Sequence, residues 1–329
     1  MGILFIEVCP HRKGMTNTTV LVLGATGGIG GEVARTLLAR GWTIRALSRD
    51  AAAAARKEPR FQWRQGDALN APDVLAAAQG ASVIVHAVNP PGYRDWDKVV
   101  LPMLDSTIAA ARAVGARIVF PGTVYNFGPD AFPTLTERSP QHPTTKKGAI
   151  RVEMERRLEA AGVPVIIVRC GDYFGPGAPS TWFSGGLIKP GKAVRAIQNP
   201  ARGGIGHQWA YLPDVAETMV RLLERATELP RFAVYHMEGF YDADGTQMVS
   251  AIQRAVATRP PIKAFPWWIV PLLAPFVRFM RELLEMRYLW KQPLRMTNER
   301  LVATLGAEPH TPIDEAVKTT LVGLGCIAA

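Results

Sequence analysis

The clearest pattern in the chain is an alternation of short apolar runs with longer amphipathic stretches. Apolar runs of four to six residues are typical of parallel strands that are buried on both faces. The runs occupy residues 20–23, 42–47, 82–87, 117–120, 164–169 and 233–237. The amphipathic stretches, which predict helices, occupy residues 30–40, 96–114, 145–161 and 213–226. This order predicts an α/β fold with a doubly wound parallel sheet of the Rossmann type.

The first strand ends in a glycine-rich turn that opens the first helix. Gly24, Gly27 and Gly30 follow the spacing G-x-x-G-x-x-G. Such glycines permit a sharp turn, a close approach of the backbone to a pyrophosphate, and tight packing of helix on strand. The alternative is a glycine-rich turn without a ligand. The residues expected to contact the cofactor are Gly24, Thr26, Gly27, Gly28, Ile29 and Gly30.

The end of the second strand indicates which dinucleotide is bound. An acidic residue there would hold a 2′-hydroxyl, whereas this chain has Ser48 and Arg49. A hydroxyl beside a guanidinium suits a 2′-phosphate, which favours NADP(H), although Arg49 could also be a solvated surface residue. Asp67 could accept a hydrogen bond from adenine, or it could cap the next helix. The other cofactor contacts are expected at Ala68, Ala87 and Val88.

Composition narrows the possible functions. The chain has 329 residues and a formal net charge of +10, but its basic residues are scattered rather than clustered, which disfavours nucleic-acid binding. Its three cysteines show no zinc-binding spacing, so no metal is expected, and they fit a reducing, cytoplasmic setting. Residues 260–281 are strongly apolar but contain prolines and Arg278. They predict helices that line a pocket or an oligomer interface rather than a membrane span, with peripheral membrane contact as an alternative.

The predicted organisation has two parts after an N-terminal extension at residues 1–17. Residues 18–170 form the NADP-binding Rossmann domain, to which residues 205–237 return. Residues 171–204 and 238–329 form a smaller, substrate-binding region. Aromatic residues gather in this region and suggest a fairly apolar substrate; they are Tyr173, Trp182, Phe183, Trp209 and Trp267.

Several motifs in order resemble the extended short-chain dehydrogenase/reductase superfamily, in its epimerase/dehydratase-like branch. Besides the glycine turn, they include RCGDYFGP at 169–176, similar to R-P-x-N-V-Y-G-P, and HQWAYLPDVA at 207–216, similar to R-D-F-x-H-V-x-D-V-A. Residues 66–67, 85–88 and 123–125 resemble further motifs of this branch. The resemblance covers residues 18–240 and also implies a homodimer.

The resemblance implies catalysis by a Ser/Thr together with a Tyr-x-x-x-Lys pair, but residues 140–156 contain no tyrosine. The best alignment places Lys147 at the Tyr position and Arg151 at the Lys position. Pro121 falls at the hydroxyl position, and Thr123 is the nearest hydroxyl. Arg151 would then hold the ribose hydroxyls, and Lys147 would act as acid or base.

Other assignments of these residues stay open. Lys147 and Arg151 could belong to a charged, solvated helix face. Tyr125 and Tyr173 are alternative proton donors. His86, at the end of the fourth strand, is more often structural in such a position than catalytic.

The leading hypothesis is an NADP(H)-dependent oxidoreductase that acts on a small, fairly apolar carbonyl or alcohol substrate. A second is a non-catalytic NADP(H)-binding sensor or regulatory protein, suggested by the missing Tyr and Lys. A nucleotide-sugar epimerase or dehydratase is third, because these enzymes usually depend on the same tyrosine.

Overall fold

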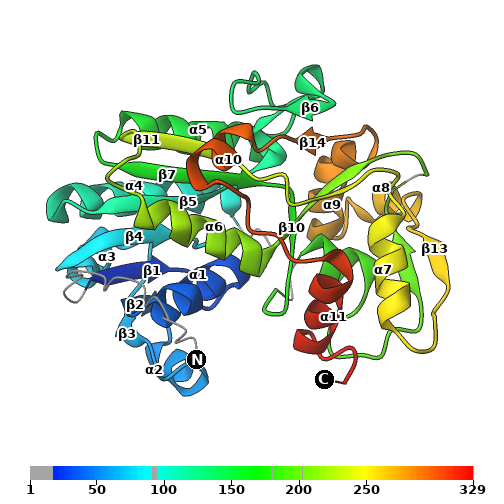
Figure 1. The fold of residues 1–329 in the computed structure, drawn as a ribbon, viewed down its shortest axis with the longest axis horizontal. Helices are drawn as coiled ribbons and strands as arrows, with labels where there is room; N and C mark the ends of the chain where they lie inside the picture. The colour runs from blue at the N-terminus through cyan, green and yellow to red at the C-terminus, as the bar shows by residue number, and fades with distance from the viewer. Residues whose placement is uncertain (1–17, 91–94, 179–180, 202, 329) are drawn as a thin grey trace, which may run out of the picture.

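The largest sheet of the molecule has seven parallel strands and lies on the left in Figure 1. The computed structural model describes residues 18–90, 95–178, 181–201 and 203–328. The strand order is β11-β7-β5-β4-β1-β2-β3, so, from the point between β1 and β4, β1 to β3 extend the sheet in one direction and β4 and the later strands extend it in the other. Ligands of doubly wound folds bind at such a point, beyond the carboxyl ends of the strands. The strands are β1 Thr19–Leu23, β2 Thr43–Ser48, β3 Gln62–Gln65, β4 Ala81–His86, β5 Arg117–Thr123, β7 Val165–Cys170 and β11 Phe232–His236.

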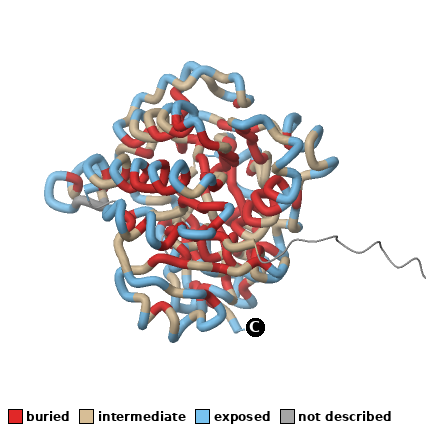
Figure 2. The backbone as a smooth tube through the Cα atoms, turned by 90° about the vertical axis from the view of Figure 1, so that its left-hand side faces the viewer, coloured by how far each residue is buried: buried red, intermediate tan, exposed pale blue. Residues whose placement is uncertain are grey.

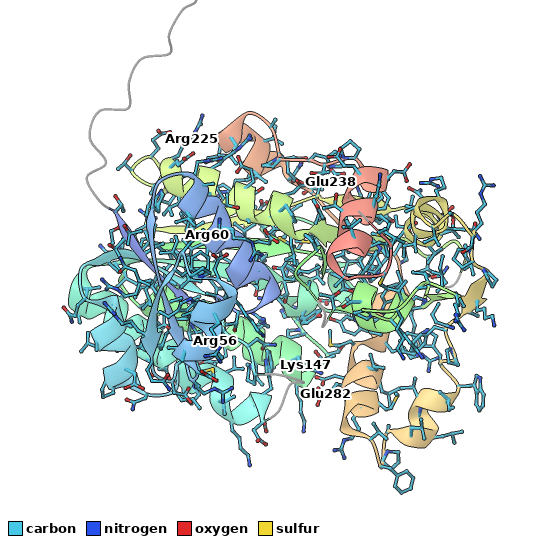
Figure 3. All side chains as sticks on the ribbon, turned by 90° about the horizontal axis from the view of Figure 1, so that it is seen from below. Arg56, Arg60, Lys147, Arg225, Glu238 and Glu282 are labelled. Carbon is cyan, nitrogen blue, oxygen red and sulfur yellow. The ribbon has the colours of Figure 1, made fainter. Side chains whose placement is uncertain are left out.

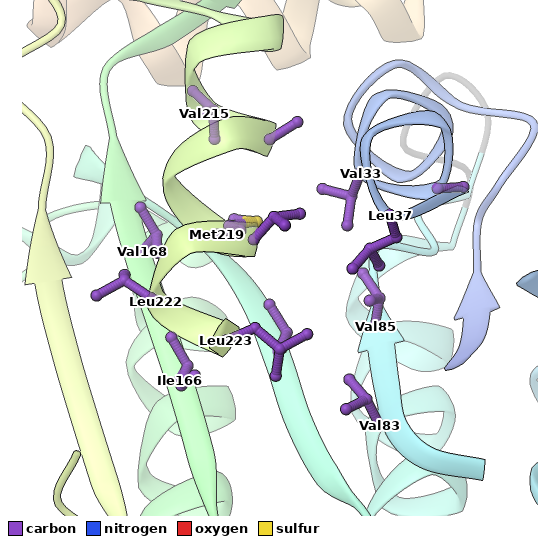
Figure 4. Close-up of a cluster of buried hydrophobic side chains, with 14 of the residues drawn as sticks. Val33, Leu37, Val83, Val85, Ile166, Val168, Val215, Met219, Leu222 and Leu223 are labelled. Carbon is purple, nitrogen blue, oxygen red and sulfur yellow. The ribbon is translucent and has the colours of Figure 1, made fainter. Parts of the chain in front are cut away.

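Helices cover both faces of this sheet, as the apolar pattern predicts. On one face, α1 (Gly28–Ala39) and α6 (Leu212–Glu224) pack on the sheet through Val33, Leu37 and Met219 (Figure 4). On the other face lie α3, α4 and α5. Their bounds are Ala71–Ala78, Trp96–Val114 and Lys146–Ala160. Buried residues accordingly concentrate along the middle of the molecule, between two exposed outer layers (Figure 2).

The second part of the chain adds three small sheets. In the first, β10 pairs with β12 on one side and β8 on the other; the other two pair β13 with β9 and β14 with β6. The strands are β6 Thr134–Leu135, β8 Asp172–Phe174, β9 Ile197–Asn199, β10 His207–Tyr211, β12 Phe240–Asp242, β13 Ile262–Ala264 and β14 Arg295–Met296. The remaining α-helices are α2 Ala51–Lys57, α7 Gln247–Ala255, α8 Ile269–Leu273, α9 Arg278–Met286, α10 Glu299–Leu305 and α11 Ile313–Gly323.

The aromatic residues of this part are mostly core residues. Phe183 and Trp209 are fully buried, in one cluster with Trp290 and residues of α7 and α11. Trp182 and Trp267 pack against the same cluster and are only partly exposed. The two small cavities near these rings have room for little more than one water molecule each. Phe183 and Trp209 are therefore core residues, and their burial does not support contact with a substrate.

Two further predictions concern the N-terminal extension and the apolar stretch at residues 260–281. The predicted N-terminal extension, residues 1–17, lies outside the described residues. The apolar stretch 260–281 folds into β13, α8 and the start of α9. Among the described residues, no helix is both long enough and apolar enough to cross a membrane.

Candidate cofactor and active site

The glycine turn has the geometry of a phosphate cradle. Gly24 has a φ of +91°, and a Cβ there would lie 2.4 Å from the carbonyl oxygen of Ala87. A Cβ on Gly30 would lie 2.3 Å from the carbonyl oxygen of Gly24. Neither position can hold a side chain without displacing the backbone. A Cβ on Gly27 would meet only the Gly24 oxygen, at 3.3 Å, so the exposed side of this residue is open.

The first turn of α1 offers free amide groups beside this opening. Gly27 caps the helix without a side-chain hydrogen bond, and the first turn contains no acidic residue. The N–H groups and the positive end of the helix dipole are therefore available to an anion. Thr26 is exposed and Ile29 is half-buried beside them. Gly28 packs on α6, because a Cβ there would come within 3.1 Å of Leu212. These features fit the pyrophosphate of a dinucleotide.

The end of β2 presents a basic residue. Arg49 is exposed, and within the described part of the chain its guanidinium has no ion-pair partner. Gln65 fixes the backbone here, because its Nε2 donates a hydrogen bond to the Arg49 carbonyl oxygen at 2.5 Å. Ser48 accepts a hydrogen bond from the N–H of Asp50. The Asp50 carboxylate caps α2 by accepting from Ala53, at 2.9 Å, so it is already occupied.

Asp67 and its neighbours lie where the adenine end of the cofactor is expected. Asp67 accepts a hydrogen bond from Leu69 at 3.0 Å and does not cap α3, whose N-cap is Asn70. The alternative that Asp67 caps this helix is therefore wrong. Ala68 is buried, and Ala87 and Val88 are half-buried beyond the end of β4.

Lys147 is buried in a cluster of charges at the start of α5. Thr145 caps this helix, accepting from Gly148 at 3.0 Å, which sets Lys147 in the first turn. Only 3% of Lys147 is exposed. Its ammonium lies 2.9 Å from Oε2 of Glu285 and also contacts Glu282, both on α9 (Figure 3). Its backbone N–H donates to the other oxygen of Glu285 at 2.9 Å.

Arg151 and Glu155 continue along the same side of α5. The Arg151 guanidinium lies 5.6 Å from the ring centre of Trp96 and 5.5 Å from that of Phe120. It also donates to the carbonyl oxygen of Pro121 at 3.3 Å. Glu155 is buried and pairs with Arg169 at 2.5 Å. This side of the helix faces the protein, so the alternative of a charged, solvated helix face is wrong for Lys147, while Arg151 is half-buried.

His86 has the environment of a structural histidine. It is buried, and its Nδ1 lies 2.7 Å from the Thr107 hydroxyl. Burial, and secondly the positive charge of Arg151, lower the pKa of His86 to about 3. The imidazole is therefore neutral at physiological pH.

Tyr125 belongs to a hydrogen-bonded chain that the sequence patterns do not indicate. Its hydroxyl donates to Oδ1 of Asp172 at 3.4 Å, and Oδ2 of Asp172 lies 2.9 Å from Nε2 of His207. The His207 ring stacks on Trp290, with ring centres 3.6 Å apart, and its Nδ1 lies 3.3 Å from the carbonyl oxygen of Leu289. One signal could have revealed this pair: Asp172 and His207 stand where the aligned family motifs have Asn and Arg.

The other hydroxyl candidates are tied to the backbone. Thr123 accepts a hydrogen bond from the N–H of Tyr125 at 3.2 Å. Tyr173 donates to the carbonyl oxygen of Gly122 at 3.1 Å, and burial raises the pKa of Tyr173 well above its usual value. Tyr173 is therefore held neutral.

The structure brings the four catalytic candidates to one edge of the sheet. Thr123 is the last residue of β5, and Tyr125 lies in the short helix Val124–Asn126 that follows it. A Cβ on Gly148 would lie 2.4 Å from the carbonyl oxygen of Tyr125, so the first turn of α5 packs directly on this segment. Lys147 and Arg151 are thereby held beside it, at the same edge as the glycine turn.

Fold and cradle together define a Rossmann protein of the NAD(P)-binding class. A model of the NAD dependent epimerase/dehydratase family matches residues 20–237. The chain belongs to this family. An NAD(P) cofactor is expected for its members.

Individual relatives are distant. A 3-diazoavenalumate denitrifying reductase from Streptomyces sp. is 26% identical over 276 residues, covering 77% of this chain and 86% of that protein. The UDP-glucuronic acid 4-epimerase from Bacillus cereus, solved in complex with NAD, has a TM-score of 0.72 at 17% identity, covering 95% of this chain and 99% of that one. WbmH from Bordetella bronchiseptica, solved with NAD+, has a TM-score of 0.68 at 18% identity, covering 94% and 98%. These structures share the fold.

Proposed function

We propose that the chain is an NADP(H)-dependent oxidoreductase that acts on a small, fairly apolar carbonyl or alcohol. The observation that carries the proposal is the meeting of the glycine cradle with proton-bearing side chains, Tyr125 and Lys147, at one sheet edge. The distant reductase relative supports this class of reaction.

The cofactor would lie along the carboxyl ends of the strands. The turn at Gly27 and Gly28 would hold the pyrophosphate, and Asp67 would lie at the adenine. Arg49 would pair with the 2′-phosphate, since the neighbouring Asp50 is occupied as a helix cap. When bound, the dinucleotide supplies or accepts the hydride.

The protein's own contribution is a proton donor to the substrate oxygen. We assign this role to Lys147, with Tyr125 as the competing candidate. Glu282 and Glu285 contact the Lys147 side chain and orient it, because a buried ammonium needs compensating carboxylates. Arg151 would hold the ribose hydroxyls, and Thr123 would offer a second hydroxyl to the substrate.

Purified protein with NADPH and a panel of apolar aldehydes and ketones tests this proposal. We expect consumption of NADPH that depends on the carbonyl compound. Tight NADPH binding without turnover of any panel member would contradict it.

One observation favours the second function, a non-catalytic NADP(H) sensor. Lys147 is already engaged by two carboxylates and is shielded from solvent, as a structural residue would be. A sensor should distinguish NADP from NADPH in affinity and catalyse no turnover. A nucleotide-sugar epimerase or dehydratase ranks third, because Lys147 stands where those enzymes usually have tyrosine.

A further inference from the structure

The most exposed large apolar side chains of the described residues lie together around α8. Trp268 is 72% exposed, Leu272 62% and Phe276 87%, with Val277 beside them. We call these four residues the apolar tip. The spacing of four residues places the first three on one side of a helical segment. Figure 3 shows α8 and α9 projecting from the margin of the molecule.

No comparable group occurs elsewhere in the described chain. The other exposed large apolar side chains are at most 41% exposed, and each belongs to a different part of the fold. Two of them, Leu284 on α9 and Ile262 on β13, lie in the elements that flank α8 in the sequence. Single exposed apolar residues are ordinary, but a contiguous group marks an interaction site. The apolar tip therefore requires an occupant.

The area of the apolar tip argues against a second copy of the chain. Three large side chains at these exposures offer on the order of 400–500 Å². A stable protein interface needs about 800 Å² from each partner. A small, projecting group of Trp, Phe and Leu is instead suited to insertion among lipid headgroups.

The charged residues near the apolar tip indicate what kind of partner surface it would bind. Residues 260–281 contain Lys263, Arg278 and Arg281 and no Asp or Glu. Lys263 and Arg281 are exposed. The first acidic residues of α9, Glu282 and Glu285, are held by Lys147. A basic rim around an apolar projection is complementary to an anionic lipid surface.

We propose that the apolar tip docks on an anionic membrane. Trp268, Leu272 and Phe276 enter the headgroup region, while Lys263 and Arg281 meet the lipid phosphates. The contact is peripheral, because no described helix is long and apolar enough to cross the bilayer.

Co-sedimentation of the full chain with vesicles tests this docking. We expect at least about tenfold stronger binding to vesicles that contain phosphatidylglycerol than to pure phosphatidylcholine. The double variant Trp268→Ser/Phe276→Ser should lose binding to both. The matched control, Leu75→Ser/Val302→Ser, alters two exposed apolar residues elsewhere and should bind as the parent does.

If circular dichroism shows that the apolar variant is misfolded, a charge variant provides an independent test. Lys263→Glu/Arg281→Glu should abolish the preference for anionic vesicles. The proposal is overturned if the parent binds neither vesicle, or if the control loses binding equally. It is also overturned if analytical ultracentrifugation shows a dimer that only the apolar variant dissociates, because the occupant is then a second copy. None of these outcomes depends on turnover of a carbonyl compound.

Discussion

Replacing Lys147 by Met separates a structural from a catalytic role for this residue. The substitution keeps the length of the side chain and removes its charge. Glu282 and Glu285 then lose their shared partner while their side chains are only 20% and 24% exposed. Lys146, its neighbour, is exposed and serves as the matched control.

The expected loss of stability follows from the burial of Lys147 with its two carboxylate partners. Removing one partner of a buried ion pair costs about 3–5 kcal/mol. The two carboxylates keep some solvent, so we expect Lys147→Met to lower the free energy of unfolding by about 2–4 kcal/mol. Lys146→Met should change it by less than about 0.5 kcal/mol. Urea unfolding followed by circular dichroism measures both.

A compensated variant removes the electrostatic penalty. In Lys147→Met/Glu282→Gln/Glu285→Gln no carboxylate is left unpaired, so most of the lost stability should return. If Lys147 is the proton donor, turnover should stay reduced by about a hundredfold in both variants, while NADPH affinity is unchanged. Steady-state turnover and cofactor titration on the same preparations give the comparison.

Three results would each refute a part of this reasoning. If the triple variant recovers turnover together with stability, Lys147 only clamps α9 to α5. If Lys147→Met keeps parental turnover, the donor has to be sought at Tyr125, Tyr173 or Thr123. Unchanged stability in Lys147→Met would instead show that the buried ion cluster does not form.

Three further predictions concern the cofactor cradle and the core. NADP(H) should bind at least tenfold tighter than NAD(H), a difference in binding free energy of about 1.4 kcal/mol. Arg49→Ala should remove most of this preference, as measured by cofactor titration. Equal affinities in the parent protein would exclude a contact between Arg49 and the 2′-phosphate. Gly27→Val should abolish saturable NADPH binding but leave the fold intact, since a Cβ there meets only one atom, whereas Gly24→Ala should also lower the melting temperature. Because the pKa of His86 is about 3 in the folded chain against 6.5 ordinarily, the unfolded chain takes up a proton first as pH falls. Stability should therefore fall by about 1.4 kcal/mol per pH unit between these values, and His86→Asn should flatten the measured slope by that amount.

The fold was predictable because its signals are local. Most strands of the parallel sheet coincide with an apolar run, although β3, with the sequence QWRQ, does not. The glycine turn marks the start of α1 within a few residues. The helix predicted over 96–114 is confirmed as α4 with the same bounds. The positions of Gly24 and Gly30 follow from the turn itself, since only glycine fits so close to the backbone of a neighbouring segment.

The environment of the catalytic candidates was not predictable, because it depends on distant segments. Lys147 and Glu285 are separated by 138 positions, and Asp172 and His207 by 35. No periodicity or spacing encodes such contacts. Apolar content also could not tell a substrate-binding region from a core, because Trp209, one of the aromatic residues that suggested an apolar substrate, is fully buried.

The family match ends at residue 237, but the candidate site does not. Glu282 and Glu285 reach Lys147, while Leu289 and Trp290 contact His207. All four belong to α9 and the short helix Arg287–Trp290, beyond the matched segment. The matched part therefore explains why a dinucleotide would bind, since it contains the whole glycine cradle. In the function that we propose, the reaction would depend on the later segment, because Glu282 and Glu285 of that segment contact Lys147. Variants in α9 should consequently change substrate turnover while cofactor affinity stays constant, and variants at the glycine turn should do the reverse.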